Sequence, residues 1–168
     1  LVQAIGCKRG EKFNSKDIRY EKIIIMTDAD VDGAHISTLL MAFFYKEFPK
    51  LIDEGHLYLS VPPLYRITKG SKILYAVNDK HKDEIIKKEF KGSEVNINRF
   101  KGLGEMMPAQ LKETTMSPDN RTLLKVQIAS KDKKSTLKSV DALMGKKPEL
   151  RFKFITENSK KISAESIL

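Results

Sequence analysis

The sequence is poor in the residues that crosslink small proteins or hold soft metals. It has a single cysteine, Cys7, so neither a disulfide framework nor a thiolate zinc site can form within the chain. Its three histidines are scattered and form no H-x-x-x-H pair. The longest apolar stretch, Ile36 to Tyr45, contains Ser37 and Thr38 and is too short to span a bilayer. No signal peptide is present, so we expect a cytoplasmic protein.

The charge of the chain is unbalanced. Lys and Arg number 31 against 22 Asp and Glu, which gives a net charge of +9. An excess of this size favours a polyanionic partner such as nucleic acid, although many basic proteins bind none. Hydrophobic residues make up 40% of the 168 residues and charged residues 32%, which is typical of a folded protein with a proper core.

Hydrophobic periodicity predicts a strand, a helix and a second strand between residues 23 and 61. Ile23 to Thr27 is a short apolar run, typical of a strand buried on both faces of a parallel sheet. A second strand at 57–61 ends at Pro62-Pro63. Between them, apolar residues recur on one face of a helix that ends before Pro49. These residues are Ile36, Leu39, Leu40, Phe43 and Phe44.

Beyond Pro63 the pattern indicates an α+β region. Two alternating stretches on either side of Lys69–Lys72 predict a hairpin. The other expected elements are a charged helix at 79–90, an extended segment at 95–100, a helix opened by Pro108 and ending at 116, an extended segment at 122–128, and helical patches at 137–144 and 149–157.

We divide the chain into three parts: residues 1–63, residues 64–129 and a basic helical tail at 130–168. The sequence begins within a helical pattern, with neither Met nor a helix cap before Leu1. We therefore expect a piece of a longer polypeptide.

Three carboxylates, Asp28, Asp30 and Asp32, follow the first expected strand directly. Sites in open α/β sheets lie at the carboxyl ends of strands, and three like charges this close repel one another unless a cation lies among them. Helix capping and the helix dipole are the structural alternative, which accounts for one or two of the acids. The motif favours a metal site with oxygen ligands, suited to Mg²⁺, Mn²⁺ or Ca²⁺.

Two other interpretations of the motifs fail. The acidic stretch matches the opening of an EF-hand loop, but Leu39 stands where a bidentate Glu is required and a strand precedes the motif. Gly102-Leu103-Gly104 lacks the third glycine of a dinucleotide fingerprint. An Mg²⁺ ion held by one or two carboxylates, with water and a substrate phosphate, fits better. In a basic protein this indicates phosphodiester chemistry on nucleic acid.

Several motifs in a fixed order resemble one family. They are Thr27–Gly33, Gly55–Tyr58, Pro62–Arg66, Arg99–Met106 and Gln110–Met116. Over nearly its whole length the chain resembles the B subunits of bacterial type IIA DNA topoisomerases, with the three aspartates in the place of the TOPRIM acidic motif. The resemblance implies an α/β fold: the C-terminal part of a TOPRIM domain, with a Rossmann-like parallel sheet flanked by helices, and an α+β C-terminal extension that packs on it.

The resemblance also implies an activity, which is ATP-dependent, reversible double-strand DNA cleavage and religation. The attacking tyrosine would belong to the partner A subunit, so none of the five tyrosines here is the expected nucleophile. Asp28 and Asp30 are the expected catalytic carboxylates. The expected Mg²⁺ ligands are Asp28, Asp30 and Asp32, of which Asp32 would orient another ligand or a metal-bound water. Mn²⁺ or Ca²⁺ would be able to replace Mg²⁺ in binding.

Four basic residues are the expected DNA contacts: His35, Arg99, Lys101 and Arg151. His35 begins the helix after the acidic motif, and a helix N-terminus favours anions. Arg151 resembles a family position that touches DNA. Each has a structural alternative, which is a solvated side chain for these two and loop packing for Arg99 and Lys101. The glycines between Lys101 and Glu105 would let the backbone approach the first sheet closely.

Two branches of the family compete. The lack of a large insertion before Lys101 and the ending Leu143–Phe152 favour topoisomerase IV, with its A subunit ParC as partner in a heterotetramer, over gyrase. The family's E-G-D-S-A motif and ATPase module would precede Leu1, so we expect this chain alone neither to cleave DNA nor to hydrolyse ATP. Another TOPRIM enzyme, such as a primase or nuclease, and a metal-independent DNA-binding module remain as alternatives.

Overall fold

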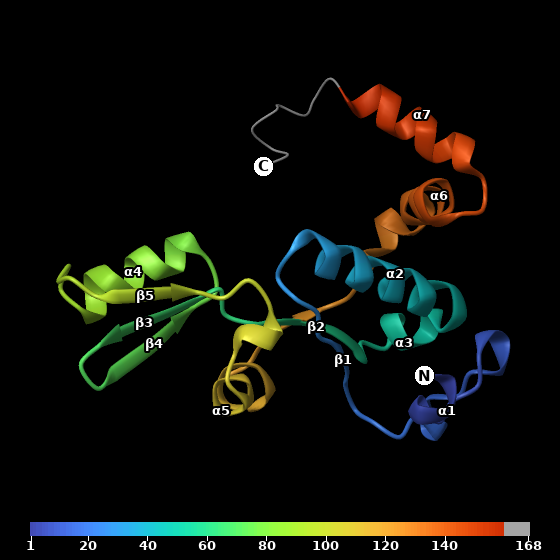
Figure 1. Cartoon of the computed structure of the whole chain (residues 1–168). Coiled ribbons are helices and arrows are strands. Elements are labelled where there is room, and N and C mark those ends of the chain that lie inside the picture. The colour runs from blue at the N-terminus through green and yellow to red at the C-terminus, as the bar shows by residue number, and fades with distance from the viewer. Residues whose placement is uncertain (160–168) are drawn as a thin grey trace. The chain divides into compact units, whose positions relative to one another are not determined.

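The computed structural model describes residues 1–159, and the chain divides into two compact units (Figure 1). The first is Leu1–Val126 and the second begins at Gln127. The sequence-based division into three parts stays a prediction. No helix within the described range is long and apolar enough to cross a membrane.

The first unit contains the expected strand, helix and strand. β1 (Ile23–Ile25) and β2 (Leu57–Val61) pair in parallel, and α2 (Val31–Glu47) with the short α3 (Pro49–Asp53) connects them. Pro49 occupies the first turn of α3, where a proline N–H is not needed. The side chains buried most completely in this part of the core are Phe44, Phe48, Leu51 and Leu57.

Three details of this part differ from the sequence expectation. β6 (Thr122–Lys125) pairs antiparallel with β2, so the sheet has the order β1-β2-β6 and is mixed instead of parallel throughout. Of β1 only Ile25 is buried, because within the described residues that strand has a neighbour on one side only. The apolar stripe of α2 is buried at Phe44, whereas Ile36 and Leu39 remain 50% and 48% exposed.

A second sheet follows, and it is antiparallel. β3 (Tyr65–Lys69) lies between β4 (Lys72–Ala76) and β5 (Asn96–Arg99), and α4 (Asp79–Glu89) packs against it. The expected hairpin is therefore present, with Gly70 at a positive φ in its turn. The core between this sheet and α4 contains the buried residues Tyr65, Ile67, Ala76 and Phe90.

The expected helix from Pro108 to Met116 is not uniform. It begins as α5 (Pro108–Leu111) and continues as a π-helical turn, η4 (Lys112–Met116). Within this turn Thr114 is buried, and its Oγ1 donates to the carbonyl of Gln110 at 2.8 Å. The remaining short helices of the first unit are α1 (Val2–Ile5), η1 (Gly10–Lys12), η2 (Ser15–Asp17) and η3 (Leu103–Glu105).

The second unit is helical over its described part. It consists of η5 (Ser130–Asp132), α6 (Lys133–Met144) and α7 (Pro148–Asn158), as the helical patches predict. α6 and α7 pack against each other. Several of their large apolar side chains stay exposed: Leu137, Leu150, Phe152, Phe154 and Ile155.

Candidate functional site

The acidic loop, residues 26–30, connects the carboxyl end of β1 to α2. Asp30 is the N-cap of α2, and its Oδ1 accepts a hydrogen bond from the Gly33 N–H at 2.7 Å. Gly33 is buried, and a Cβ at this position would lie 2.1 Å from the carbonyl oxygen of Asp28. Glycine therefore lets the first turn of α2 pack directly on the loop.

All three aspartates of the motif are exposed. Asp32 lies in the first turn of α2, where a negative charge interacts favourably with the helix dipole. The capping interpretation is thus confirmed for Asp30, and Asp32 has the dipole interaction that it predicts. Asp28 has neither role, because it precedes the cap.

Asp28 instead contacts a segment far along the chain. Its Oδ1 accepts a hydrogen bond from the backbone N–H of Leu103 at 2.7 Å. The backbone comes this close because residue 102 is glycine: a Cβ on Gly102 would lie between 2.9 and 3.1 Å from the three atoms of the Asp28 carboxylate group. The expected close approach of the glycines is therefore confirmed for Gly102, but not for Gly104, which has open space around its Cα.

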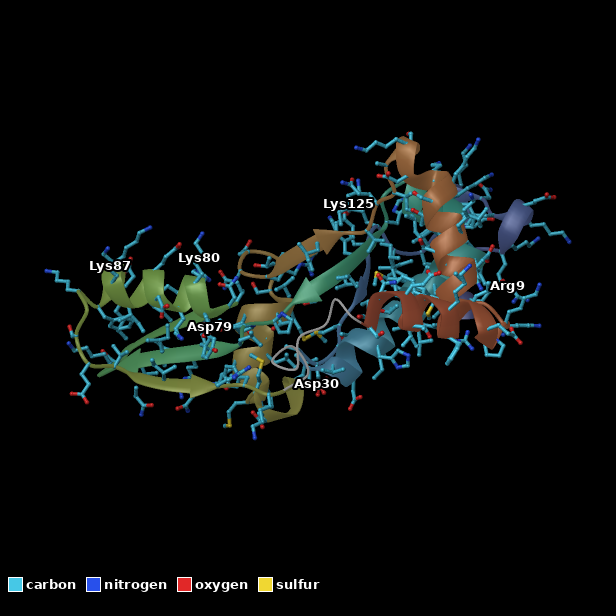
Figure 2. All side chains as sticks on the ribbon, turned by 90° about the horizontal axis from the view of Figure 1, so that it is seen from above. Arg9, Asp30, Asp79, Lys80, Lys87 and Lys125 are labelled. Atoms are coloured by element: carbon cyan, nitrogen blue, oxygen red, sulfur yellow. The ribbon has the colours of Figure 1, made fainter. Side chains whose placement is uncertain are left out.

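Two of the expected DNA contacts lie beside the acidic loop. Arg99 and Lys101 line a cleft of about 680 Å³ that Asp30 also lines. The other lining residues are Ala29, Val31, Ala34, Leu64 and Phe100. Figure 2 shows Asp30 at the start of α2, at some distance from the α4 side chains of Lys80 and Lys87. An anionic group in this cleft would have two cationic side chains and the carboxylate of Asp30 among its neighbours.

Strand pairing fixes the basic wall of this cleft. Arg99 is opposite Tyr65 in the β3–β5 register, and the N–H of Phe100 donates to the carbonyl of Leu64 at 2.8 Å. Immediately beyond, the N–H of Lys101 donates to Oε2 of Glu105 at 2.8 Å, which closes the loop that carries Leu103. The second sheet therefore positions Arg99 at the end of β5, and the loop that continues from β5 carries Lys101 and the Leu103 N–H.

A polar cluster ties α4 to the same sheet. Oδ1 of Asp79 accepts hydrogen bonds from Lys82 Nζ and from the Tyr65 hydroxyl, both at 2.8 Å. The hydrogen bond from Lys82, followed by that from Tyr65, lowers the pKa of Asp79. The same Asp79 contact raises the pKa of Lys82 and that of Tyr65. Lys82 Nζ also lies 4.8 Å from the centre of the Tyr65 ring.

The oxygen donors of the acidic loop fit an Mg²⁺ ion in part. Within residues 1–159, no three His, Cys, Asp or Glu side chains come together as a metal-binding group. Asp28 and Asp30 each use one carboxylate oxygen for a backbone N–H, which leaves the second oxygen of each for a ligand. Mg²⁺ commonly takes one or two protein carboxylates and fills its shell with water and phosphate. Ligation by all three aspartates stays a prediction.

The other two expected DNA contacts, His35 and Arg151, lie on different elements and do not line this cleft. His35 is exposed on α2, one turn beyond the acidic loop. Arg151 belongs to the second unit, where its Nη1 donates to the carbonyl of Gly145 at 2.6 Å between α6 and α7. That hydrogen bond gives Arg151 a local structural role, and DNA contact by either residue stays a prediction.

Sequence reasoning missed two features of the site. Leu103 acts through its backbone N–H, which no residue type reveals, although the flanking glycines indicated a close backbone approach. The Tyr65–Asp79–Lys82 cluster was also missed, because its members belong to different elements and only Asp79 and Lys82 have a helical i, i+3 spacing.

Comparison with known proteins extends the argument to the whole chain. The model of the Toprim domain matches residues 4–62, and that of the carboxyl terminus of the DNA gyrase B subunit matches residues 92–156. The B subunit of DNA topoisomerase 4 from Bartonella bacilliformis is 58% identical over 160 residues, which are 95% of this chain and 23% of that protein. The chain belongs with the B subunits of the type IIA DNA topoisomerases.

Two further relatives of the chain are also B subunits. The topoisomerase 4 B subunit from Caulobacter vibrioides is 54% identical over 98% of this chain and 24% of its own length. The DNA gyrase B subunit from Clostridium acetobutylicum is 48% identical over 96% of the chain and 25% of its own length. The chain thus spans about a quarter of the length of these relatives. Asp28 lies in the Toprim match and Leu103 in the gyrase B match, so their hydrogen bond joins the two matched regions, as the pairing of β2 with β6 also does.

Proposed function

We propose that this chain is the metal- and DNA-binding part of a type IIA topoisomerase B subunit of the topoisomerase IV kind. One observation carries the proposal. The carboxylates of a Toprim match follow the carboxyl end of a parallel strand, and one of them, Asp30, lines a cleft together with Arg99 and Lys101. A cation and a DNA phosphate are the groups that such a pairing of charges suits.

In the proposed reaction a tyrosine of the A subunit attacks a DNA phosphorus atom. A bond from phosphorus to the tyrosine oxygen forms, the bond to the 3′ oxygen breaks, and religation is the reverse. Mg²⁺, when bound, supplies positive charge that stabilises the leaving oxygen. Asp28 and Asp30 hold the ion, with Asp32 in an orienting role. Arg99, Lys101, His35 and Arg151 contact the phosphate backbone, which positions the duplex without reading its sequence.

The rest of the protein completes the site in this proposal. The chain spans about a quarter of the length of its relatives. We therefore assign ATP hydrolysis and a further acidic metal ligand to the rest of the B subunit, outside this chain. We accordingly propose that the chain acts with the A subunit, on DNA in the cytoplasm, and that the 168-residue chain by itself does not turn over.

Substitution of the two main carboxylates tests the proposal. In the assembled enzyme, Asp28→Asn and Asp30→Asn should each reduce Mg²⁺-dependent cleavage of plasmid DNA by about 100-fold or more, since each removes a ligand charge next to the reacting phosphate. Asp119→Asn, an exposed aspartate of the turn after η4, is the matched control and should cleave normally. Normal cleavage by both loop variants would instead favour a DNA-binding module that needs no metal.

Gyrase is the second candidate, and the 48% identity to a gyrase B subunit supports it. The two assemblies differ in what they do to DNA. Decatenation and relaxation without introduction of supercoils would support topoisomerase IV, whereas ATP-dependent negative supercoiling of a relaxed plasmid would support gyrase.

A further inference from the structure

We propose that the loop Lys101–Glu105, named here the glycine loop, positions the metal-binding carboxylate of Asp28 through the backbone N–H of Leu103. The inference rests on the proposed function, in which Asp28 is a metal ligand. It adds that the ligand's geometry is set by a segment outside the Toprim match, in the region that matches the gyrase B carboxyl terminus.

The hydrogen bond itself favours such a role. An N–H···O distance of 2.7 Å to a carboxylate is at the short end of the range and indicates a charge-assisted bond. An exposed aspartate otherwise rotates freely, and a metal that binds it must first stop that rotation. With Oδ1 held by Leu103, Oδ2 has a fixed direction before any ion arrives. Groups that orient a ligand in this way commonly affect metal affinity by about 10- to 100-fold.

The donor is itself held from several sides. The Lys101 N–H donates to Glu105 Oε2 at 2.8 Å, and the Glu105 N–H donates to the Gly102 carbonyl at 3.2 Å. The Met106 N–H donates to the Leu103 carbonyl at 3.1 Å, and the Met106 side chain is buried. These hydrogen bonds and the buried Met106 side chain place the Leu103 N–H at a defined point of the loop that follows β5.

A consequence is that metal binding and the contact between the glycine loop and Asp28 are thermodynamically coupled. If the loop raises the affinity of Asp28 for a cation, the cation stabilises the loop contact by the same factor. Bound metal should then slow hydrogen exchange of the Leu103 N–H, because it holds the acceptor in place.

The two glycines of the loop provide a matched pair of variants. Gly102 has an extended backbone (φ −161°, ψ 173°) that alanine also adopts, so Gly102→Ala introduces no backbone strain. Its new Cβ would come within 2.9 to 3.1 Å of the Asp28 carboxylate group, which is the end of a flexible side chain and rotates away. Gly104→Ala adds the same methyl group two residues on, where nothing lies within 4 Å.

The experiment measures Mn²⁺ binding by electron paramagnetic resonance and hydrogen exchange of the Leu103 N–H, in the complete B subunit. Gly102→Ala should weaken Mn²⁺ binding by about tenfold or more and speed Leu103 exchange, whereas Gly104→Ala should change the affinity less than about twofold. Thermal unfolding of both variants checks that the fold is retained. Asp28→Ala, without metal, should speed Leu103 exchange as Gly102→Ala does.

The outcomes separate this inference from the proposed function. Mn²⁺ binding that is unchanged by Asp28→Ala would overturn the metal-ligand role of Asp28 and the inference with it. Asp28-dependent binding that is equal in Gly102→Ala and Gly104→Ala would leave the proposed function intact and overturn the positioning role. Equal Leu103 exchange with and without Mn²⁺ in the wild type would also contradict the linkage.

Discussion

The Leu103 N–H and the Asp28 Oδ1 atom lie 2.7 Å apart, although 75 positions separate them in the sequence. Asp28 follows the parallel strand β1, and Leu103 follows β5 of the antiparallel sheet. Beside this contact, Asp30 of the acidic loop and Arg99 at the end of β5 line one cleft, so residues from both sheet regions contribute to a single charged site.

The N-cap role of Asp30 can be separated from its charge. Asp30→Ala should destabilise the chain by about 1 kcal/mol, because it removes the acceptor of the Gly33 N–H at the start of α2. Asp30→Asn should be within about 0.5 kcal/mol of the wild type, since asparagine caps helices as well as aspartate does. Urea unfolding at neutral pH measures both values. Equal destabilisation by the two variants would contradict the capping role.

Gly33 should tolerate no side chain. In Gly33→Ala the new Cβ would overlap the Asp28 carbonyl oxygen, which is backbone and cannot move without distorting the acidic loop. We expect a loss of about 1 to 3 kcal/mol in the free energy of unfolding. Gly104→Ala is the control and should change it by about 0.5 kcal/mol or less. A Gly33→Ala protein of wild-type stability would show that the packing of α2 on the loop is described wrongly.

The basic wall of the cleft should control the salt dependence of DNA binding. Arg99→Gln and Lys101→Gln should each lower the slope of log affinity against log salt concentration by about one unit, because each removes one phosphate contact. Lys87→Gln makes the same charge change on α4, away from Asp30, and should leave the slope unaltered (Figure 2). Fluorescence anisotropy with duplexes of two unrelated sequences should give the same losses for both.

Acid stability should depend on Asp79. Its pKa is lowered in the folded chain, chiefly by Lys82, so its contribution to stability is complete above the ordinary aspartate pKa and is lost as the pH falls through the lowered value. Below about pH 4, wild-type protein should therefore lose stability more steeply than Asp79→Asn. Tyr65→Phe removes one of the two donors and should give an intermediate slope. Urea unfolding across about pH 2.5 to 6 measures this, and parallel curves would contradict it.

Local pattern was sufficient to predict the elements of the first sheet region and the hairpin. Apolar runs and periodicity located β1, α2 and β2, and the turn at Lys69–Lys72 located β3 and β4. The pattern could not assign the partner of β6, because an extended segment carries no mark of the edge it will join. It also could not predict the π-helical turn at Lys112–Met116, where the hydroxyl of Thr114 bonds the backbone.

The candidate site was predictable in its residues but not in its contacts. The spacing of Asp28, Asp30 and Asp32 after a strand indicated a charged site. It did not reveal that Asp30 caps α2 or that Asp28 accepts a hydrogen bond from Leu103. These roles depend on backbone N–H groups that every residue except proline possesses, so only the folded chain distinguishes them.

The central claim is that Asp28 holds a divalent cation beside a DNA phosphate. The most direct measurement is anomalous X-ray scattering from crystals of the assembled enzyme with DNA and Mn²⁺. Our account predicts a manganese peak in contact with Asp28 Oδ2 and with a phosphate oxygen of the duplex, while Leu103 still donates to Oδ1. A manganese ion at the cleaved phosphate with no contact to Asp28, or an Asp28 carboxylate turned into solvent, would contradict it.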